Sequence, residues 1–249
     1  IGIVRSYRDI EDNWRKGRMS ALLTIEEGGV CQGSLRFLRD FYRLGVRMMT
    51  LTWNFPNELG FPNKRERRED GTTYLVPDQS NGLTGTGIEF VEEMERLGMI
   101  IDVSHLNDAG IWDVFRHTKK PFVASHSNAR AVASHPRNMT DDMIRELADR
   151  GGVMGINYYT CFLRDFCQDE APVSRVSYMV EHMKHIRNVG GIGCLGLGSD
   201  FDGIECELEM KDASMVPMLA DAMKREGFSQ SEIEAVFYKN VLRVYREIL

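Results

Sequence analysis

The sequence predicts an α/β fold around a parallel sheet, either doubly wound or closed into a (β/α)8 barrel. Two observations predict it. Short apolar runs alternate with amphipathic segments of helical period along the whole chain. The length of 249 residues, 43% of them hydrophobic, suits one large barrel or two modest domains, and either can bury a proper core.

Each apolar run in turn predicts a strand. The first run, residues 19–26, ends abruptly in acidic residues and Gly28-Gly29, as a buried parallel strand does. The remaining strands are expected at residues 46–53, 99–105, 121–126, 151–159 and 191–200. These six strands are two fewer than a (β/α)8 barrel requires. The chain begins with Ile1 and enters a helix-like stretch without an obvious starting strand.

Amphipathic segments between these runs predict the helices. The expected helices at 34–44 and 86–97 end at Gly45 and Gly98, and Thr140 caps the start of the helix at 140–150. Helices are expected at 34–44, 86–97, 108–118, 140–150 and 173–189, and two or three more from about 214 to 249. The polar stretch 54–82 is too long for a plain connection and predicts a functional loop or lid. Its charge run, Lys64 to Asp70, is interpreted as a solvated face.

The composition excludes several classes of protein. The net charge is −6 and no basic patch is visible, which argues against a nucleic-acid or anionic-membrane partner. No apolar run approaches the roughly 18 to 20 residues of a membrane helix. The five cysteines contain no C-x-x-C pair, so a reducing, cytoplasmic setting is expected. No phosphate-binding glycine motif opens a helix, so the nucleotide-binding version of the fold has no support.

Four of the six apolar runs end in a residue that can bind a metal: Glu26, His105, His126 and Asp200. In a barrel these carboxyl ends converge on one face. Two imidazoles and a carboxylate suit Zn²⁺, and Asp200 could hold another ion or act as a general base. A single histidine at a strand end is more often structural, but these two follow matched Val-Ser-His and Ala-Ser-His endings.

Other polar residues have less specific interpretations. Asp102, three residues before His105, is either a support for that histidine or a carboxylate at the edge of the core. His117, His182 and His185 lie on helices and are interpreted as structural or surface residues.

Four segments in order are specific enough to indicate a family. They are IDVSHLNDAGIWDVF, KKPFVASHSNARAVASHPRNMTDD, GGVMGINYY and GLGSDFDG, between residues 101 and 203. The set resembles the membrane (renal) dipeptidase family of zinc metallopeptidases, including its bacterial cytoplasmic members. The resemblance implies a (β/α)8 barrel with two zinc ions that hydrolyses dipeptides and tolerates a D-amino acid at the C-terminal position.

The resemblance also implies roles for individual residues. Glu26 matches the carboxylate that bridges the two zinc ions, with Glu27 as the alternative register, and His105 and His126 match the histidines of one zinc. Asp200 matches the residue that binds the other zinc and takes part in proton transfer. Arg137 matches the arginine that holds the C-terminal carboxylate of the substrate, which suits a guanidinium fork.

This sequence departs from the family pattern at two places. The family's first strand carries a His-x-Asp pair for the remaining zinc, whereas the first histidine here is His105. With the count of six strands, this predicts one barrel domain over 1–249 that lacks its first two strands. Mammalian members polarise the scissile carbonyl with a histidine where this chain has Trp53, which donates one hydrogen bond without charge. Asn54 is the alternative donor.

The leading hypothesis is therefore a zinc-dependent dipeptidase with a small dipeptide as substrate, and the family suggests a homodimer. Two alternatives stay open. One is another metal-dependent amide or ester hydrolase on the same barrel. The other is a catalytically silent protein that binds a small peptide. In that case the natural protein itself lacks the His-x-Asp pair.

Overall fold

The computed structural model describes residues 1–165 and 173–249. Within them the chain forms two compact units, each with its own buried core. The first unit consists of Ile1–Val123 and Arg243–Leu249, and the second of Ala124–Leu242. We describe each unit by itself.

The first unit is built on parallel strands. Their hydrogen-bonded order is β1 (Gly2–Val4), β2 (Ser20–Ile25), β3 (Val46–Thr50) and β6 (Ile100–Asp102), followed by Val123, the first residue of β7 (Val123–Ala124). All these neighbours run parallel, which requires the crossover helices that the alternating sequence pattern predicts.

The register of these strands brings their carboxyl ends to one edge. Ile25 pairs with Met49, and Met49 pairs with Ile101. Thr50 pairs with Asp102, which in turn pairs with Val123. The loops that follow β2, β3 and β6 therefore leave the sheet side by side.

Helices cover the strands of the first unit: α1 (Tyr7–Arg15), α2 (Leu35–Leu44), α3 (Gly85–Leu97) and α4 (Asp108–His117). Side chains cap two of them, because the Thr84 hydroxyl accepts from the Gly87 N–H and the Asn107 amide oxygen from the Gly110 N–H. Apolar residues of α2, α3 and the strands pack into the core, and Leu38, Phe90, Met94 and Ile100 are fully buried.

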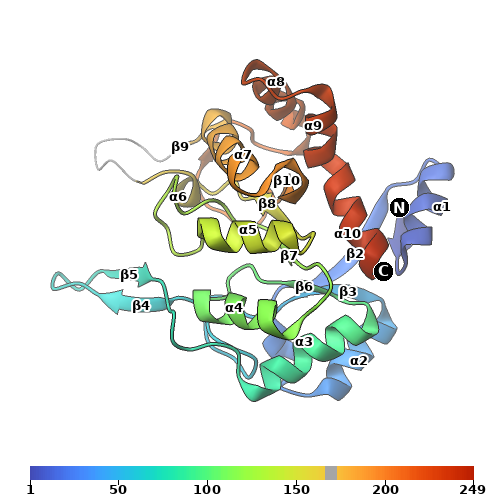
Figure 1. The fold of residues 1–249 in the computed structure, drawn as a ribbon, viewed down its shortest axis with the longest axis vertical. Helices are drawn as coiled ribbons and strands as arrows, with labels where there is room; N and C mark the ends of the chain where they lie inside the picture. The colour runs from blue at the N-terminus through green and yellow to red at the C-terminus, as the bar shows by residue number, and fades with distance from the viewer. Residues whose placement is uncertain (166–172) are drawn as a thin grey trace. The chain divides into compact units, whose positions relative to one another are not determined.

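A two-stranded antiparallel hairpin projects from the loop after β3 (Figure 1). It consists of β4 (Lys64–Arg67) and β5 (Thr73–Val76). Its charged residues are exposed, which confirms the solvated face expected for the charge run. At its base, the Phe61 oxygen accepts from the Asn107 N–H and the Asp78 oxygen from the Ala109 N–H, so the hairpin is tied to the start of α4.

In the second unit, β8 (Val153–Ile156) pairs in parallel with β10 (Leu195–Leu197). A short parallel pair, β9 (Val173–Ser174) with β11 (Glu207–Leu208), lies outside this sheet. The helices are α5 (Asp141–Asp149), α6 (Thr160–Leu163), α7 (Val176–Gly190), α8 (Pro217–Arg225), α9 (Gln230–Glu234) and α10 (Asn240–Ile248), whose last residues belong to the first unit. The α9 and α10 helices are joined by a π-helical turn, Ala235–Lys239.

Two glycines allow close packing at the ends of β8 and β10. A Cβ on Gly155 would lie 2.2 Å from the Ser125 carbonyl oxygen, and one on Gly198 would lie 2.0 Å from the same atom. The Ser127 N–H also donates to the Gly155 oxygen at 2.8 Å. Glycine is therefore required at both positions, because the obstacle is backbone.

The structure confirms all six predicted strands, although each is shorter than expected. The prediction that no strand precedes residue 19 is wrong: β1 was missed because only one of its three residues, Val4, is buried, so it leaves no period. Apart from the short β9–β11 pair, the parallel strands of the described part of the chain therefore number seven rather than six. The β4–β5 hairpin, β9, β11 and α6 were not predicted.

The expectation of one barrel domain over 1–249 stays a prediction. Among the described residues, no helix is both long enough and apolar enough to cross a membrane.

Candidate active site

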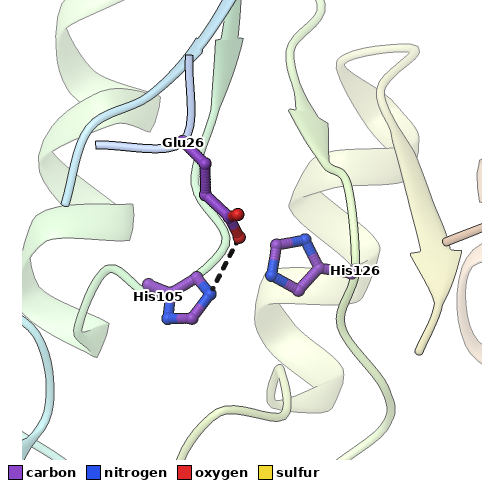
Figure 2. Close-up of side chains that lie close together, drawn as sticks. All are labelled: Glu26, His105 and His126. Atoms are coloured by element: carbon purple, nitrogen blue, oxygen red, sulfur yellow. Dashed lines mark ion pairs between the residues drawn. The ribbon is translucent and has the colours of Figure 1, made fainter. Parts of the chain in front are cut away.

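The first unit brings a carboxylate and a histidine together at the carboxyl ends of its strands. Glu26 follows β2 and His105 follows β6, and the Glu26 Oε1 atom lies 3.4 Å from the His105 Nε2 atom. Figure 2 shows the carboxylate directed at the imidazole; it also labels His126, which belongs to the second unit. The Glu26 side chain is 55% exposed and that of His105 only 9%. Such a pair presents an oxygen and a nitrogen at a surface that solvent reaches.

Glu27, the alternative register, has a different task. Its carboxylate accepts from the Gly29 N–H at 2.9 Å and from the Asn57 side-chain amide at 2.5 Å. It thereby caps the 3₁₀ turn Gly28–Cys31 and fixes the loop after β3. Because this carboxylate serves the backbone, the geometry favours Glu26 over Glu27 as the metal ligand.

Two neighbours contact the His105 ring, and a third residue fixes the turn that carries it. The Asn54 Oδ1 atom lies 3.0 Å from His105 Nδ1, and the Trp53 ring lies 6.2 Å from the imidazole, centroid to centroid. The buried Asp102 carboxylate accepts from the Ser104 N–H at 3.0 Å and fixes the turn that carries His105. This contact favours the interpretation of Asp102 as a support for the histidine over that of a carboxylate at the edge of the core.

His105 and Asp200 share an unusual backbone conformation. Among the described residues, three that are not glycine have positive φ: Gln32 at 51°, His105 at 70° and Asp200 at 60°. A left-handed conformation is uncommon for side chains with a Cβ, and such residues cluster at functional sites. Two of the three are residues that the sequence predicts as metal ligands.

In the second unit, Asp200 follows β10 and contacts a residue that follows β8. The Asn157 Nδ2 atom donates to the Asp200 Oδ2 atom at 3.0 Å. The orientation of this amide is fixed, because its own oxygen accepts from the Tyr159 N–H at 2.6 Å. A Cβ on Gly203 would lie 2.2 Å from Asp200 Oδ1, so a larger residue there would displace the Asp200 carboxylate from its present position. Asn157 was not predicted; its only sequence signal is its place directly after an apolar run.

His126 and Arg137 are both buried, with 8% and 7% of their surface exposed. The Ser125 hydroxyl lies 2.7 Å from His126 Nδ1. The Arg137 guanidinium stacks 5.3 Å from the Phe162 ring centre. The backbone N–H of Arg137 donates to His135 Nδ1. Burial, with the charges of Arg137 and Arg130, lowers the pKa of His135 to about 4. The loop therefore keeps a neutral imidazole under a buried cation.

The structure confirms that His117, His182 and His185 are structural or surface residues. His117 and His185 each pair with a carboxylate on a neighbouring helix. His182 is fully buried on α7: its Nδ1 atom accepts from the Ala129 N–H at 3.1 Å, and its Nε2 atom contacts the Leu163 oxygen at 2.9 Å. The neutral ring therefore joins α7 to the segment after β7 and to the last residue of α6.

We expect His182 to make the protein sensitive to acid. Burial lowers its pKa to about 4, against 6.5 for an exposed histidine. Between these two pKa values only the unfolded chain binds the proton on His182. This histidine therefore lowers the free energy of unfolding as the pH falls, by about 2 kcal/mol at pH 5 relative to pH 8. Urea unfolding at pH 8 and pH 5 should show this loss shrinking in His182→Gln. At pH 8 the same variant reports the lost hydrogen bonds alone. An unchanged pH dependence in the variant would contradict the expectation.

Comparison with known proteins adds to this geometry. A family model described as membrane dipeptidase, peptidase family M19, matches residues 1–249. The chain is a member of the membrane dipeptidase family.

Relatives of this dipeptidase family member agree with the match. An uncharacterized dipeptidase of Schizosaccharomyces pombe is 35% identical over 233 residues, which is 93% of this chain and 53% of that protein, so the chain spans about half of its length. The crystal structure of a dipeptidase of family M19 is 29% identical with a TM-score of 0.88, covering 99% of this chain and 71% of that one.

A third similar protein is a metallopeptidase from Rhodobacter sphaeroides, solved with a phosphinate mimic of the dipeptide L-Ala-D-Ala. It is 26% identical with a TM-score of 0.85, covering 99% of this chain and 68% of that one. These matches show the (β/α)8-type fold of metal-dependent hydrolases and place this family member among the metallo-dipeptidases.

Proposed function

We propose that this protein is a zinc-dependent dipeptidase in which Glu26, His105 and His126 hold a metal ion. The observation that carries the proposal is the register of β6 and β7. Asp102 pairs with Val123, and the two histidines follow these paired residues by the same three positions. Paired residues of adjacent strands lie about 4.8 Å apart, so the segments that carry the two histidines leave the sheet from neighbouring positions.

The donor set fits zinc. The three side chains offer a carboxylate oxygen and two imidazole nitrogens. Zinc prefers these donors, and a catalytic zinc site has three protein ligands and an open position. The family's His-x-Asp ligands of a second zinc are absent from this sequence, in which no histidine precedes His105. The proposal for this chain therefore rests on the ion held by Glu26 and the two histidines.

A divalent ion in such a site supplies an ionised water at neutral pH and polarises the scissile carbonyl. The other residues orient the substrate and move a proton. The Asp200 carboxylate, held by Asn157, would take up a proton from the attacking water and pass it to the leaving amine. The Arg137 guanidinium binds the free carboxylate of the dipeptide, and Trp53 and Asn54 contact the substrate next to His105.

The proposed substrates are short peptides with a free carboxylate, including dipeptides that end in a D-amino acid. The support for the D-residue is the Rhodobacter sphaeroides relative, which binds a mimic of L-Ala-D-Ala. The β4–β5 hairpin, tied at its base to the segment after His105, is the proposed lid over this site.

The test is hydrolysis of L-Ala-L-Ala, L-Ala-D-Ala and the amide of L-Ala-D-Ala by the purified chain, with zinc added or with a chelator. We expect turnover of both dipeptides that the chelator abolishes and zinc restores, and at least tenfold less turnover of the amide. Equal turnover of the amide, or of simple esters and lactones, would favour another hydrolase on the same barrel. Binding of the dipeptides without turnover would favour a silent peptide-binding protein.

A further inference from the structure

The contact between Asn54 and His105 determines which nitrogen of the histidine carries the proton. The paired residues Thr50 and Asp102 place the loop after β3 beside the loop after β6, and the Leu51 N–H donates to the Asp102 oxygen across this pair. Asn54 thereby reaches the buried His105, with its Oδ1 atom 3.0 Å from His105 Nδ1. The two residues come from different loops, so their meeting is set by the register of the sheet.

An amide oxygen can only accept a hydrogen bond. A neutral imidazole has one N–H, so the Asn54 oxygen requires that proton on Nδ1 and leaves the lone pair on Nε2. Nε2 is the nitrogen that faces the Glu26 carboxylate at 3.4 Å. With the amide reversed, the proton would lie on Nε2, between the two proposed ligands. A metal ion binds only the nitrogen with the lone pair.

We propose that Asn54 is a positioning residue that holds His105 in its Nδ1-protonated form, with the Nε2 lone pair directed to the metal ion. This proposal rests on the proposed function. It gives the amide oxygen of Asn54 a task beside the one that the sequence predicts for its amide N–H, which is donation to the substrate. His105 has a left-handed backbone outside regular secondary structure, and Asn54 is a side chain that contacts its ring there.

The second unit contains a related arrangement, in which the asparagine donates through its amide N–H instead of accepting through its oxygen. Asp200 also has positive φ, and it also contacts an asparagine from the loop after the neighbouring strand, since Asn157 follows β8 and Asp200 follows β10. In each unit an asparagine side chain orients a proposed functional residue whose backbone is left-handed. The repetition indicates one structural solution used twice.

Two variants and two measurements test the proposal on the full chain. Asn54→Leu keeps the size of the side chain and removes the acceptor, whereas Asn54→Asp keeps the acceptor. In Asn54→Leu we expect zinc affinity, measured by competition with a chromophoric chelator, to fall about 10- to 100-fold. Nitrogen NMR of the metal-free protein should show His105 losing the Nδ1-protonated form. Asn54→Asp should keep that form and stay within a few-fold of the wild-type zinc affinity.

A wild-type tautomer or wild-type zinc affinity in Asn54→Leu would overturn the proposal. If Asn54→Leu does not fold, Asn54→Asp decides, because an Nε2-protonated His105 in that variant would also overturn it. The NMR result separates this proposal from the proposed function. A protein without dipeptidase turnover in which Asn54→Leu changes the tautomer would refute the function and leave the positioning role supported.

Discussion

Replacing Glu26 by glutamine is expected to lower kcat/KM for a dipeptide by about 10³-fold or more, and to weaken zinc binding in a chelator competition. The amide keeps the shape of the side chain and removes the negative charge that faces His105. The Glu26 side chain is more than half exposed, so the melting temperature should stay within about 1 °C of wild type.

Glu27→Gln is the matched control, because it makes the same chemical change at the next residue. Glu27 caps the turn that begins at Gly28 and accepts from Asn57, so its variant should lose about 1 kcal/mol of stability and keep most of its zinc affinity and turnover. If the two variants behave in the opposite way, Glu27 is the ligand and the present assignment is wrong.

Gly198→Ala is expected to destabilise the second unit by roughly 3 kcal/mol, which corresponds to a fall in melting temperature of about 10 °C. The added Cβ would lie 2.0 Å from the Ser125 oxygen and 2.9 Å from the carbonyl carbon and oxygen of Gly155. These are backbone atoms that cannot rotate away, so β10 or the segment after β7 must move.

Gly193→Ala is the control in the same stretch of sequence. A Cβ there meets nothing within 4 Å, so this variant should melt close to wild type. Calorimetric scans of both variants measure the difference. Similar melting temperatures for the two would show that the backbone around Ser125 and Gly155 yields easily, contrary to the packing described.

Much of the fold could be predicted because burial leaves a period in the sequence. The run at 46–50 has four of five residues buried, and the run at 153–156 is buried throughout, so both strands are visible as apolar segments. Strand β1 has one buried residue and the hairpin strand β4 has none. Such strands are held by backbone pairing, which the side-chain pattern does not record.

The sequence predicts those residues of the candidate site that lie directly at the ends of apolar runs. His105 and His126 end apolar runs, and the β6–β7 pairing gives them equivalent positions. What could not be predicted depends on contacts between distant residues. The proposed preference for Glu26 over Glu27 rests on the contact of Glu27 with Asn57, thirty positions away, and the support of Asp200 comes from Asn157. Neither contact has a local sequence signal.

The left-handed backbones at His105 and Asp200 lower the stability of the chain at two residues of the proposed site. Glycine at either position would adopt the same conformation without the cost of a Cβ, so folding alone favours a residue that cannot perform the proposed chemistry. Engineering that selects for heat resistance alone would therefore drift toward inactive proteins at these two positions. A screen for more robust variants needs activity as a second criterion.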